Sequence, residues 1–466
     1  MICKVHFVVV LVCFFGCVEL QERNWKVISK TRTIQTRQGP VEGLVTQSPF
    51  NNKLRNVEVY LGLPYAAPPV GSQRFMPPGS PPTWKTTLQA DRLPAVCPQR
   101  LPQIGRRRQD KSAERNRQLR RLLPFLTNEN EDCLYLNIYA PARDNPMASR
   151  KYPVIVFIHG ESFEWNSGNP YDGSVLASFG EVIVITLNFR LGILGFLRPG
   201  VSDHTLSNFG LLDQIAALQW IKDNIRAFGG DENKVTLMGH DTGAACVNYL
   251  MVSPVSQGVT GLFHRAILMS GTALADWALT KNPMSYTVQV GNSLNCPTQE
   301  TSEGMSNCLR RKRLSDLMAV KVGVPPFQTP FGPLIDGTVV PNEPAKLMTT
   351  LKHLFSRYEL LYGMTEIESD DLLDGVSLAQ GMLEEEKMKI IKDYIRAKYE
   401  QSKHPQTQFH SSSDHARRSE LVMDDTCRLY ASGSPAVGSL LAWIELSGYN
   451  ILGVKNSKLE RNKWNI

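Results

Sequence analysis

Between residues 154 and 270, short runs of β-branched and aliphatic residues alternate with stretches in which apolar residues recur every three or four positions. The runs predict strands, and the recurring stretches predict helices with one apolar face. Strands are expected at 154–158, 182–186, 235–238, 265–269 and 359–363. The alternation is typical of an α/β fold in which helices flank a mostly parallel central sheet.

Two helices have distinct patterns. The first carries an apolar face and is expected to stop at Gly229-Gly230; its apolar positions are Leu211, Ile215, Leu218, Ile221, Ile225 and Phe228. The second is expected at residues 383–399, after an acidic loop that follows the strand at 359–363. Residues 400–420 are polar and low in apolar content, so we expect a loop there.

An apolar run lies at the N-terminus of the chain. Residues 5–18 (VHFVVVLVCFFGCV) follow Lys4 and are fewer than the roughly 20 residues that a membrane helix needs. We therefore expect residues 1–19 to be a secretory signal peptide and the protein to reach the extracellular space or the cell surface. No later apolar run is long enough to predict a membrane span.

The cysteines are interpreted for an oxidising compartment. Of nine cysteines, three fall within the expected signal peptide. Cys97, Cys133, Cys296 and Cys308 suit two disulfide-closed local loops. Cys246 lies in a run of small residues and is expected to be a buried small hydrophobe, whereas Cys427 is left over. The 466 residues, 42% of them hydrophobic, suffice for one large core, and no linker divides them.

The positive charge of the chain is concentrated in one segment. Residues 100–121 hold nine basic and two acidic residues, which accounts for the whole net charge of +7. We expect a solvated insertion inside the loop between Cys97 and Cys133. Contact with a polyanion such as a cell-surface glycan is the alternative to a plain mobile loop. Nucleic acid is not an expected partner of an extracellular chain.

The sequence GHDTG at residues 239–243 lies between the strand at 234–238 and an expected helix at 244–251. A strand, then Gly-x-nucleophile-x-Gly, then a helix is the nucleophile elbow of α/β hydrolases. The central residue here is Asp241, which has no hydroxyl to act as a nucleophile. The dipole of the helix favours its negative charge, and the simplest structural interpretation is that Asp241 caps that helix by accepting backbone N–H groups.

Other parts of a hydrolytic site also depart from what the chemistry needs. A glycine-containing turn at His159-Gly160-Glu161-Ser162 occupies the place of an oxyanion hole, and a carboxylate at Glu161 would oppose the developing negative charge. After residue 363 the only histidines are His404, His410 and His415, all in the polar segment and none beside a strand end. Because a catalytic triad acts as a unit, we expect no hydrolysis.

Six motifs together support a family resemblance: VEVYLGLPYAAPPVGSQRF (57–75), EDCLYLNIYAP (131–141), PVIVFIHGESFEWNSGNPYDGSVLASFG (153–180), LNFRLGILGFL (187–197), NFGLLDQIAALQWIKDNIRAFGGD (208–231) and FGPLIDGTVVP (331–341). The chain resembles the type-B carboxylesterase and cholinesterase superfamily. Residues 239–279 are most similar to the neuroligin-like adhesion proteins (neuroligin, gliotactin and neurotactin), in which the elbow serine is likewise absent. The resemblance implies an α/β-hydrolase domain over 30–426, with a divergent tail at 427–466.

The resemblance also implies the disulfide pairing and the place of the third catalytic group. It pairs Cys97 with Cys133 and Cys296 with Cys308. The family's acid would follow the strand at 359–363, near Ile367. Since Ile367 is not acidic, the resemblance implies that this acid is missing.

An extracellular protein partner is a further implication. In neuroligins a loop in this region takes part in calcium-assisted binding of neurexin, so the resemblance makes Glu366, Glu368, Asp370 and Asp371 candidate contacts. An acidic loop without a partner is the alternative. Calcium at such an interface is the only cofactor that we expect, and we expect no resident metal. The helix at 383–399 resembles one of two that pair family members into dimers, so a homodimer is implied.

After about residue 426 the resemblance ends, and the final family strands, the histidine-bearing loop, the stalk and the membrane span are not matched. If the chain ends at Ile466, we expect an exposed sheet edge. The expected function is non-catalytic adhesion or recognition at the cell surface, in synaptic or junctional contacts. The alternatives are a hydrolase that uses Asp241 as a carboxylate nucleophile, as epoxide hydrolases and haloalkane dehalogenases do, and an ordinary carboxylesterase.

Overall fold

The computed structural model describes residues 25–49, 54–105, 112–143, 151–202, 205–258, 261–298, 301–365, 368, 377 and 383–401, with only the backbone of 257, 258, 384 and 395–401. The expected signal peptide at 1–19 and tail at 427–466 lie outside these residues. So does most of the acidic loop, including Glu366, Ile367, Asp370 and Asp371.

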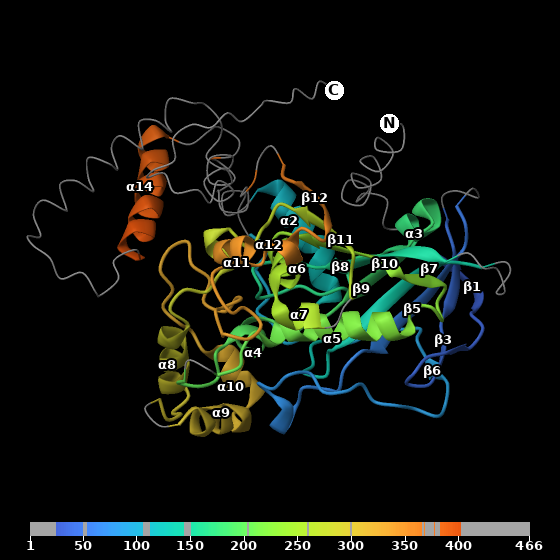
Figure 1. The fold of residues 1–466 in the computed structure, drawn as a ribbon, viewed down its shortest axis with the longest axis horizontal. Coiled ribbons are helices and arrows are strands. Elements are labelled where there is room, and N and C mark those ends of the chain that lie inside the picture. Colours follow the sequence, from blue (N-terminus) through green and yellow to red (C-terminus); the bar gives the residue numbers. More distant parts are fainter. Residues whose placement is uncertain are drawn as a thin grey trace, which may run out of the picture.

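A nine-stranded sheet forms the centre of the fold, in the order β1-β4-β5-β7-β9-β8-β10-β11-β12, and a second sheet has the order β2-β3-β6 (Figure 1). The strands are β1 (Lys26–Lys30), β2 (Ile34–Gln35), β3 (Pro40–Glu42), β4 (Leu44–Gln47), β5 (Val57–Pro64), β6 (Leu88–Gln89), β7 (Tyr135–Pro141), β8 (Tyr152–Ile158), β9 (Ile183–Leu187), β10 (Gly230–His240), β11 (Arg265–Met269) and β12 (Glu359–Gly363).

The sheet is mixed, with its parallel part at the end that carries the elbow. The strands β9, β8, β10, β11 and β12 are parallel to one another. The successive pairs β1–β4, β4–β5, β5–β7 and β7–β9 of this sheet are antiparallel. The α/β-hydrolase type of fold is confirmed, and the predicted strands occur within a few residues of their expected bounds. The mostly parallel order describes the second half of the sheet only.

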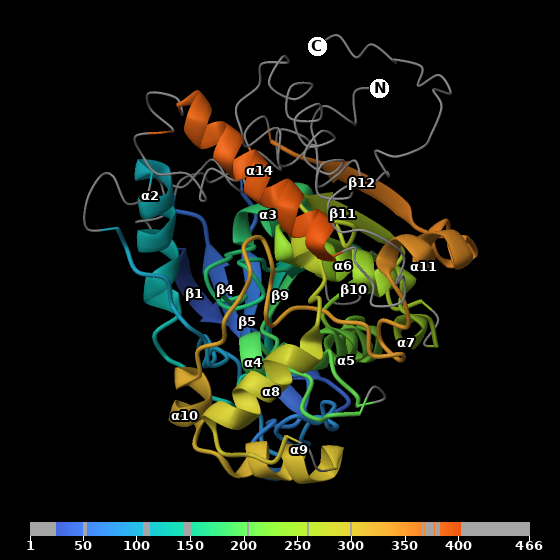
Figure 2. The same ribbon diagram turned by 90° about the vertical axis from the view of Figure 1, so that its left-hand side faces the viewer.

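The remaining elements are helices, some of which cover the central sheet. They are α2 (Ala113–Leu122), α3 (Ser174–Gly180), α4 (Gly192–Phe196), α5 (Phe209–Asn224), α6 (Thr242–Val252), α7 (Pro254–Gly258), α8 (Pro283–Ser293), α9 (Ser302–Arg311), α10 (Leu314–Ala319), α11 (Pro344–Thr350), α12 (Lys352–Phe355) and α14 (Glu384–Gln401), with 3-10 turns η2 (Gly71–Gln73), η3 (Leu123–Phe125) and η4 (Asp276–Ala278). Figure 2 shows α2 on one side of the fold and α9 and α10 at the lower end of the fold.

Alternate residues of each central strand enter different cores, because successive side chains of a strand point to opposite faces. In β8, Val154, Val156 and Ile158 pack in the main cluster with α5 and α6. Ile155 and Phe157 pack on the other face, against Leu176 of α3. With both faces covered, the strands are continuous apolar runs, as is expected for the parallel part of a sheet.

Candidate functional site

The elbow stands at the carboxyl end of β10, between β8 and β11. Asp241 has φ 55° and ψ −126°, and α6 begins at the next residue. A Cβ atom on Gly239 would lie 2.4 Å from the carbonyl oxygen of Gly243, and one on Gly243 would lie 2.2 Å from that of Ile158. Both positions therefore require glycine, and the strand-turn-helix geometry expected from GHDTG is confirmed.

The carboxylate of Asp241 turns toward the neighbouring 159–162 turn. Its Oδ2 atom accepts the backbone N–H of Glu161 at 2.8 Å and that of Ser162 at 3.4 Å. No side-chain cap hydrogen bond joins Asp241 to the N-terminus of α6. The expectation that Asp241 caps this helix is therefore wrong, because its carboxylate accepts the two N–H groups of the 159–162 turn instead.

Backbone conformation explains why these donors face Asp241. Three consecutive non-glycine residues, Glu161, Ser162 and Phe163, have φ values of 88°, 60° and 57°. Successive N–H groups of a turn can point to one side and form an anion-binding concavity, and those of Glu161 and Ser162 both donate to the Asp241 carboxylate. In a hydrolase of this geometry, such donors stabilise the oxyanion. Here the chain's own carboxylate occupies that concavity.

The side chain of Glu161 points away from this concavity. Its carboxylate accepts hydrogen bonds from the guanidinium of Arg115 at 2.8 and 3.2 Å and from the amide of Gln118 at 3.2 Å. The Arg115 and Glu161 side chains are only 12% and 11% exposed. The expectation that Glu161 would place its charge in the oxyanion region is therefore wrong: a buried arginine from another segment draws it outward.

That arginine belongs to the basic segment, part of which is packed. Ser112 accepts the N–H of Arg115 as the N-cap of α2, and Leu119 and Leu122 are fully buried. They pack against Trp165, over whose ring the Arg115 guanidinium lies at 5.6 Å. For residues 112–122 the expectation of a solvated insertion is therefore wrong, and residues 106–111 lie outside the described part of the chain.

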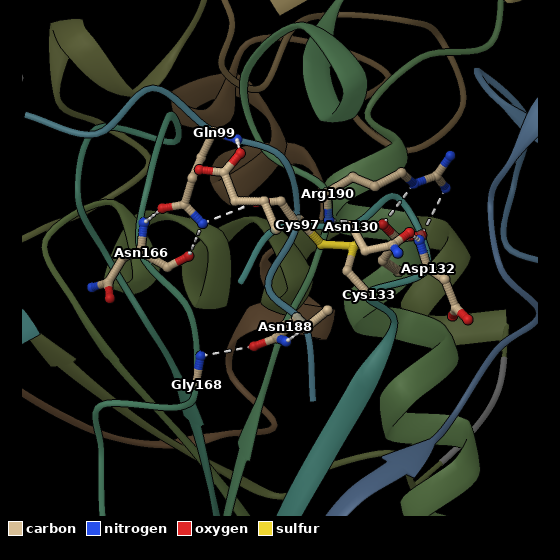
Figure 3. The surroundings of a disulfide bond; sticks show 12 residues. Cys97, Gln99, Asn130, Asp132, Cys133, Asn166, Gly168, Asn188 and Arg190 are labelled. Carbon is tan, nitrogen blue, oxygen red and sulfur yellow. Dashed lines mark hydrogen bonds and ion pairs between the residues drawn. A yellow bond between two sulfur atoms is a disulfide. The ribbon is translucent and has the colours of Figure 1, made fainter. Parts of the chain in front are cut away.

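A disulfide closes the loop that carries α2. Cys97 and Cys133 are joined with a Cα–Cα distance of 5.0 Å, and Cys296 and Cys308 with 5.7 Å, so both expected pairings are confirmed. Figure 3 shows the first disulfide beside Gln99, whose side chain exchanges two hydrogen bonds with the backbone of Asn166. The base of the loop is thereby fixed to the chain that follows the 159–162 turn.

An acidic side chain is present at the neighbouring strand ends. Glu368 is half-buried, and its Oε1 atom accepts the hydroxyl of Ser270 at 2.8 Å. The N–H of Ser270 donates to the carbonyl oxygen of Gly363, which places Glu368 at the ends of β11 and β12. The resemblance placed the acid near Ile367 and made Glu368 only a candidate partner contact, whereas its carboxylate accepts a hydrogen bond within the fold.

The buried His159 is unsuitable as a general base. His159 is buried and stacks on Phe189 at 4.4 Å, and burial lowers its pKa to about 4, so its ring is neutral and structural. The expected polar-segment histidines His404, His410 and His415 lie outside those residues. Cys246 in α6 is buried, as expected, and burial raises the pKa of its thiol to about 12.

The residues that the structure describes contain no group of three or more His, Cys, Asp or Glu side chains that could hold a metal ion. They also contain no helix that is long and apolar enough to cross a membrane.

Comparison with known proteins places this geometry in context. The model of the carboxylesterase family matches residues 30–432. Neuroligin-3 and neuroligin-2 of Mus musculus are each 38% identical to the chain, over 74% of the chain and 43% of the relative. Neuroligin-1 of Caenorhabditis elegans is 36% identical over 79% of the chain and 48% of the relative. The chain thus spans less than half the length of these relatives.

Proposed function

This chain belongs to the carboxylesterase family, and we propose that it is a non-catalytic, neuroligin-like member that recognises an extracellular protein partner at the cell surface. One observation carries the non-catalytic part of the proposal: the Asp241 carboxylate accepts the N–H groups of Glu161 and Ser162. The elbow therefore presents no hydroxyl, and its oxyanion donors are already engaged.

Electrostatics support the loss of hydrolysis. A tetrahedral oxyanion is stabilised by donors that are preorganised and free to receive it. A second negative charge in the same concavity would compete with Asp241 for those donors. Attack by Asp241 itself, as in an aspartate-nucleophile hydrolase, would require its Oδ2 atom to leave both N–H groups. That enzyme would also need a positioned histidine to activate water, and the buried His159 is unsuitable for that role.

Activity assays test this part. The purified chain, Asp241→Ser and Asp241→Ala are each incubated with an aryl ester and an epoxide, beside an active carboxylesterase as the positive control. We expect no turnover above the uncatalysed rate for any of the three. Turnover by the unaltered chain that is lost in Asp241→Ala would establish the hydrolase alternative. Ester turnover by Asp241→Ser alone would show that the remaining groups still form a working site.

The partner part of the proposal rests on the similarity to neuroligins. We propose a neurexin-type partner, in synaptic or junctional adhesion, with calcium bridging the acidic loop at Glu366, Asp370 and Asp371. Clustered carboxylates are the ligands that calcium prefers. Glu368 is assigned a different role, since its carboxylate bonds within the fold.

Binding to an immobilised neurexin ectodomain, with and without calcium, tests the partner. We expect binding that calcium strengthens and that the combined variant Glu366→Gln/Asp370→Asn/Asp371→Asn weakens at least tenfold. Glu114→Gln, an exposed acidic residue of α2, is the matched control and should bind as the unaltered chain does. Binding that is equal with and without calcium, or equal in the triple variant, would overturn this assignment.

A homodimer through α14 completes the proposal. Ile391 and Tyr394 attach the helix to the fold, and the Tyr394 hydroxyl donates to Asp276 at 2.7 Å. Leu383, just before the helix, is 71% exposed. Sedimentation equilibrium should give twice the monomer mass, whereas a single species of monomer mass over the micromolar range would contradict the dimer.

A further inference from the structure

The junction between α9 and α10 carries the sequence Arg310-Arg311-Lys312-Arg313, followed by Leu314. Lys312 and Arg313 have extended backbone conformations, with φ,ψ of −71°, 146° and −63°, 145°. Arg311 is exposed, and the Arg313 side chain is 82% exposed. Four consecutive basic residues thus lie at a helix-helix junction, away from the elbow and at the lower end of the fold in both ribbon views (Figures 1 and 2).

We propose that the Arg313–Leu314 peptide bond is a processing site for a subtilisin-like endoprotease of the secretory pathway. Such enzymes have acidic subsites that bind a basic residue directly before the cut and another at the fourth position before it, by charge complementarity. Arg313 and Arg310 hold those two positions. Hydrolysis consumes one water molecule, breaks the C–N bond, and leaves a carboxylate on Arg313 and an amino group on Leu314.

The bond is weakly held in the fold. The carbonyl oxygen of Arg313 accepts N–H groups only from within α10, those of Asp316 at 3.1 Å and Leu317 at 3.2 Å. The α10 helix has six residues, and Leu317 is its one buried side chain. A helix this short gains little from its own hydrogen bonds, so opening its first turn costs little free energy. The exposed ion pair between Arg313 and Asp316 adds little resistance.

The other end of the recognition sequence is more firmly anchored. Arg74 donates to the carbonyl oxygens of Arg310 and Lys312, at 3.1 and 2.6 Å, and Arg310 donates to the carbonyl oxygen of Arg74 at 2.9 Å. Binding in the protease must therefore release the last turn of α9 from Arg74. We expect cleavage to be slow compared with that of an unfolded peptide of the same sequence.

A second basic motif in the chain provides an internal comparison. Arg117 and Arg120 have the same spacing as Arg310 and Arg313, but they lie within α2. Leu119, between them, is fully buried against the cluster around Trp165. Cutting after Arg120 would require α2 to detach from the fold. We therefore expect the protease to cut the folded chain after Arg313 and not after Arg120.

The two fragments are expected to stay associated after cleavage. Both described disulfides close before Arg313, so neither spans the cut. After the cut, β12 still pairs with β11. The Asn208 side chain bonds the backbone of Leu334 at 2.8 and 2.9 Å. Phe331, Val339 and Leu347 stay in the main core. These contacts hold the two chains together without a covalent bond.

Limited digestion of the native full chain with a purified basic-specific subtilisin-like endoprotease tests the proposal. We expect a fragment whose amino-terminal sequence begins at Leu314, and we expect both fragments to elute together on size exclusion. Arg313→Gln should slow this cut at least tenfold. Arg120→Gln, the matched control, should leave it unchanged.

Three outcomes would overturn the proposal: an intact Arg313–Leu314 bond, cutting at this bond only after denaturation, or an unchanged rate in Arg313→Gln. Because the side chain of Arg313 is exposed and bonds only to Asp316, this variant is expected to fold. A melting temperature equal to that of the unaltered chain confirms this, and a cut at the same place in Arg310→Gln at full rate would show that the fourth position is not recognised.

Discussion

The Oδ2 atom of Asp241 lies 2.8 Å from the backbone nitrogen of Glu161. These two residues are 80 positions apart in the sequence, and the hydrogen bond joins the turn after β10 to the turn after β8. It links the nucleophile position and the oxyanion turn of a hydrolytic site by a structural hydrogen bond. The stability of the 159–162 turn should therefore depend on the side chain at position 241.

Replacing Asp241 should destabilise the protein without restoring catalysis. Asp241→Ala leaves the N–H groups of Glu161 and Ser162 without their acceptor, at a cost of about 1–3 kcal/mol in the free energy of unfolding. Asp241→Asn keeps an acceptor oxygen and should lose less than Asp241→Ala. Urea unfolding of the three proteins gives the comparison, and an Asp241→Ala variant as stable as the unaltered chain would contradict it.

The buried ion pair between Arg115 and Glu161 should contribute to holding α2 in place. Arg115→Gln leaves a buried carboxylate without its cation, so we expect a loss on the order of 3 kcal/mol in the free energy of unfolding. The exposed Arg117 of the same helix is the matched control, and Arg117→Gln should change stability by less than about 0.5 kcal/mol.

A double variant separates the contribution of the ion pair to stability from the contributions of the two individual side chains. Adding Glu161→Gln to Arg115→Gln removes the unpaired charge and should recover most of the lost stability. If the two single losses simply added, the ion pair would not be the cause.

Acid should weaken the fold through His159. Burial lowers the pKa of His159 to about 4 from 6.5, so between these values the unfolded chain binds a proton that the folded chain excludes. The contribution of His159 is fully present above pH 6.5 and is lost as the pH falls toward 4. For this shift, linkage gives about 3 kcal/mol.

The variant His159→Phe isolates that contribution, because it keeps an aromatic ring beside Phe189 and removes the titrating nitrogen atoms. The free energy of unfolding should fall less between pH 7 and pH 4 in the variant than in the unaltered chain. Parallel pH profiles for the two proteins would rule out His159 as a source of the acid sensitivity.

The two disulfides should differ in their contribution to stability. The Cys97–Cys133 pair closes a separation of 36 residues and the Cys296–Cys308 pair one of 12. The chain-entropy model gives about 1 kcal/mol more for the longer loop. Paired serine variants of each disulfide, compared by urea unfolding, test this difference. An equal or larger loss for the Cys296→Ser/Cys308→Ser protein would contradict the loop-entropy explanation.

The central strands, the elbow and the packed helix α5 could be predicted because their signals are local. Apolar runs define β8 to β11, and two glycines define the turn at Asp241. The direction of the Asp241 side chain could not be predicted in this way. It depends on a turn of non-glycine residues with positive φ, a conformation for which Glu161, Ser162 and Phe163 give no local signal.

The packing of α2 was equally hidden from the sequence. Half of its ten residues are charged, and only Leu119 and Leu122 within it are buried. The partner of Arg115 lies 46 positions away, so the charge pattern alone indicated a solvated segment. The hydrogen bond of Glu368 within the fold was not predicted for a related reason: it comes from Ser270, 98 positions earlier.

The occupied elbow has a pharmacological consequence. Organophosphates and carbamates inactivate serine esterases by transferring a phosphoryl or carbamoyl group to the elbow hydroxyl, and their oxygen atom enters the oxyanion concavity. At this elbow the hydroxyl is absent, and the oxyanion concavity is filled by the Asp241 carboxylate. Tissue exposed to such an insecticide should therefore retain this protein unlabelled while its active relatives in the family are modified.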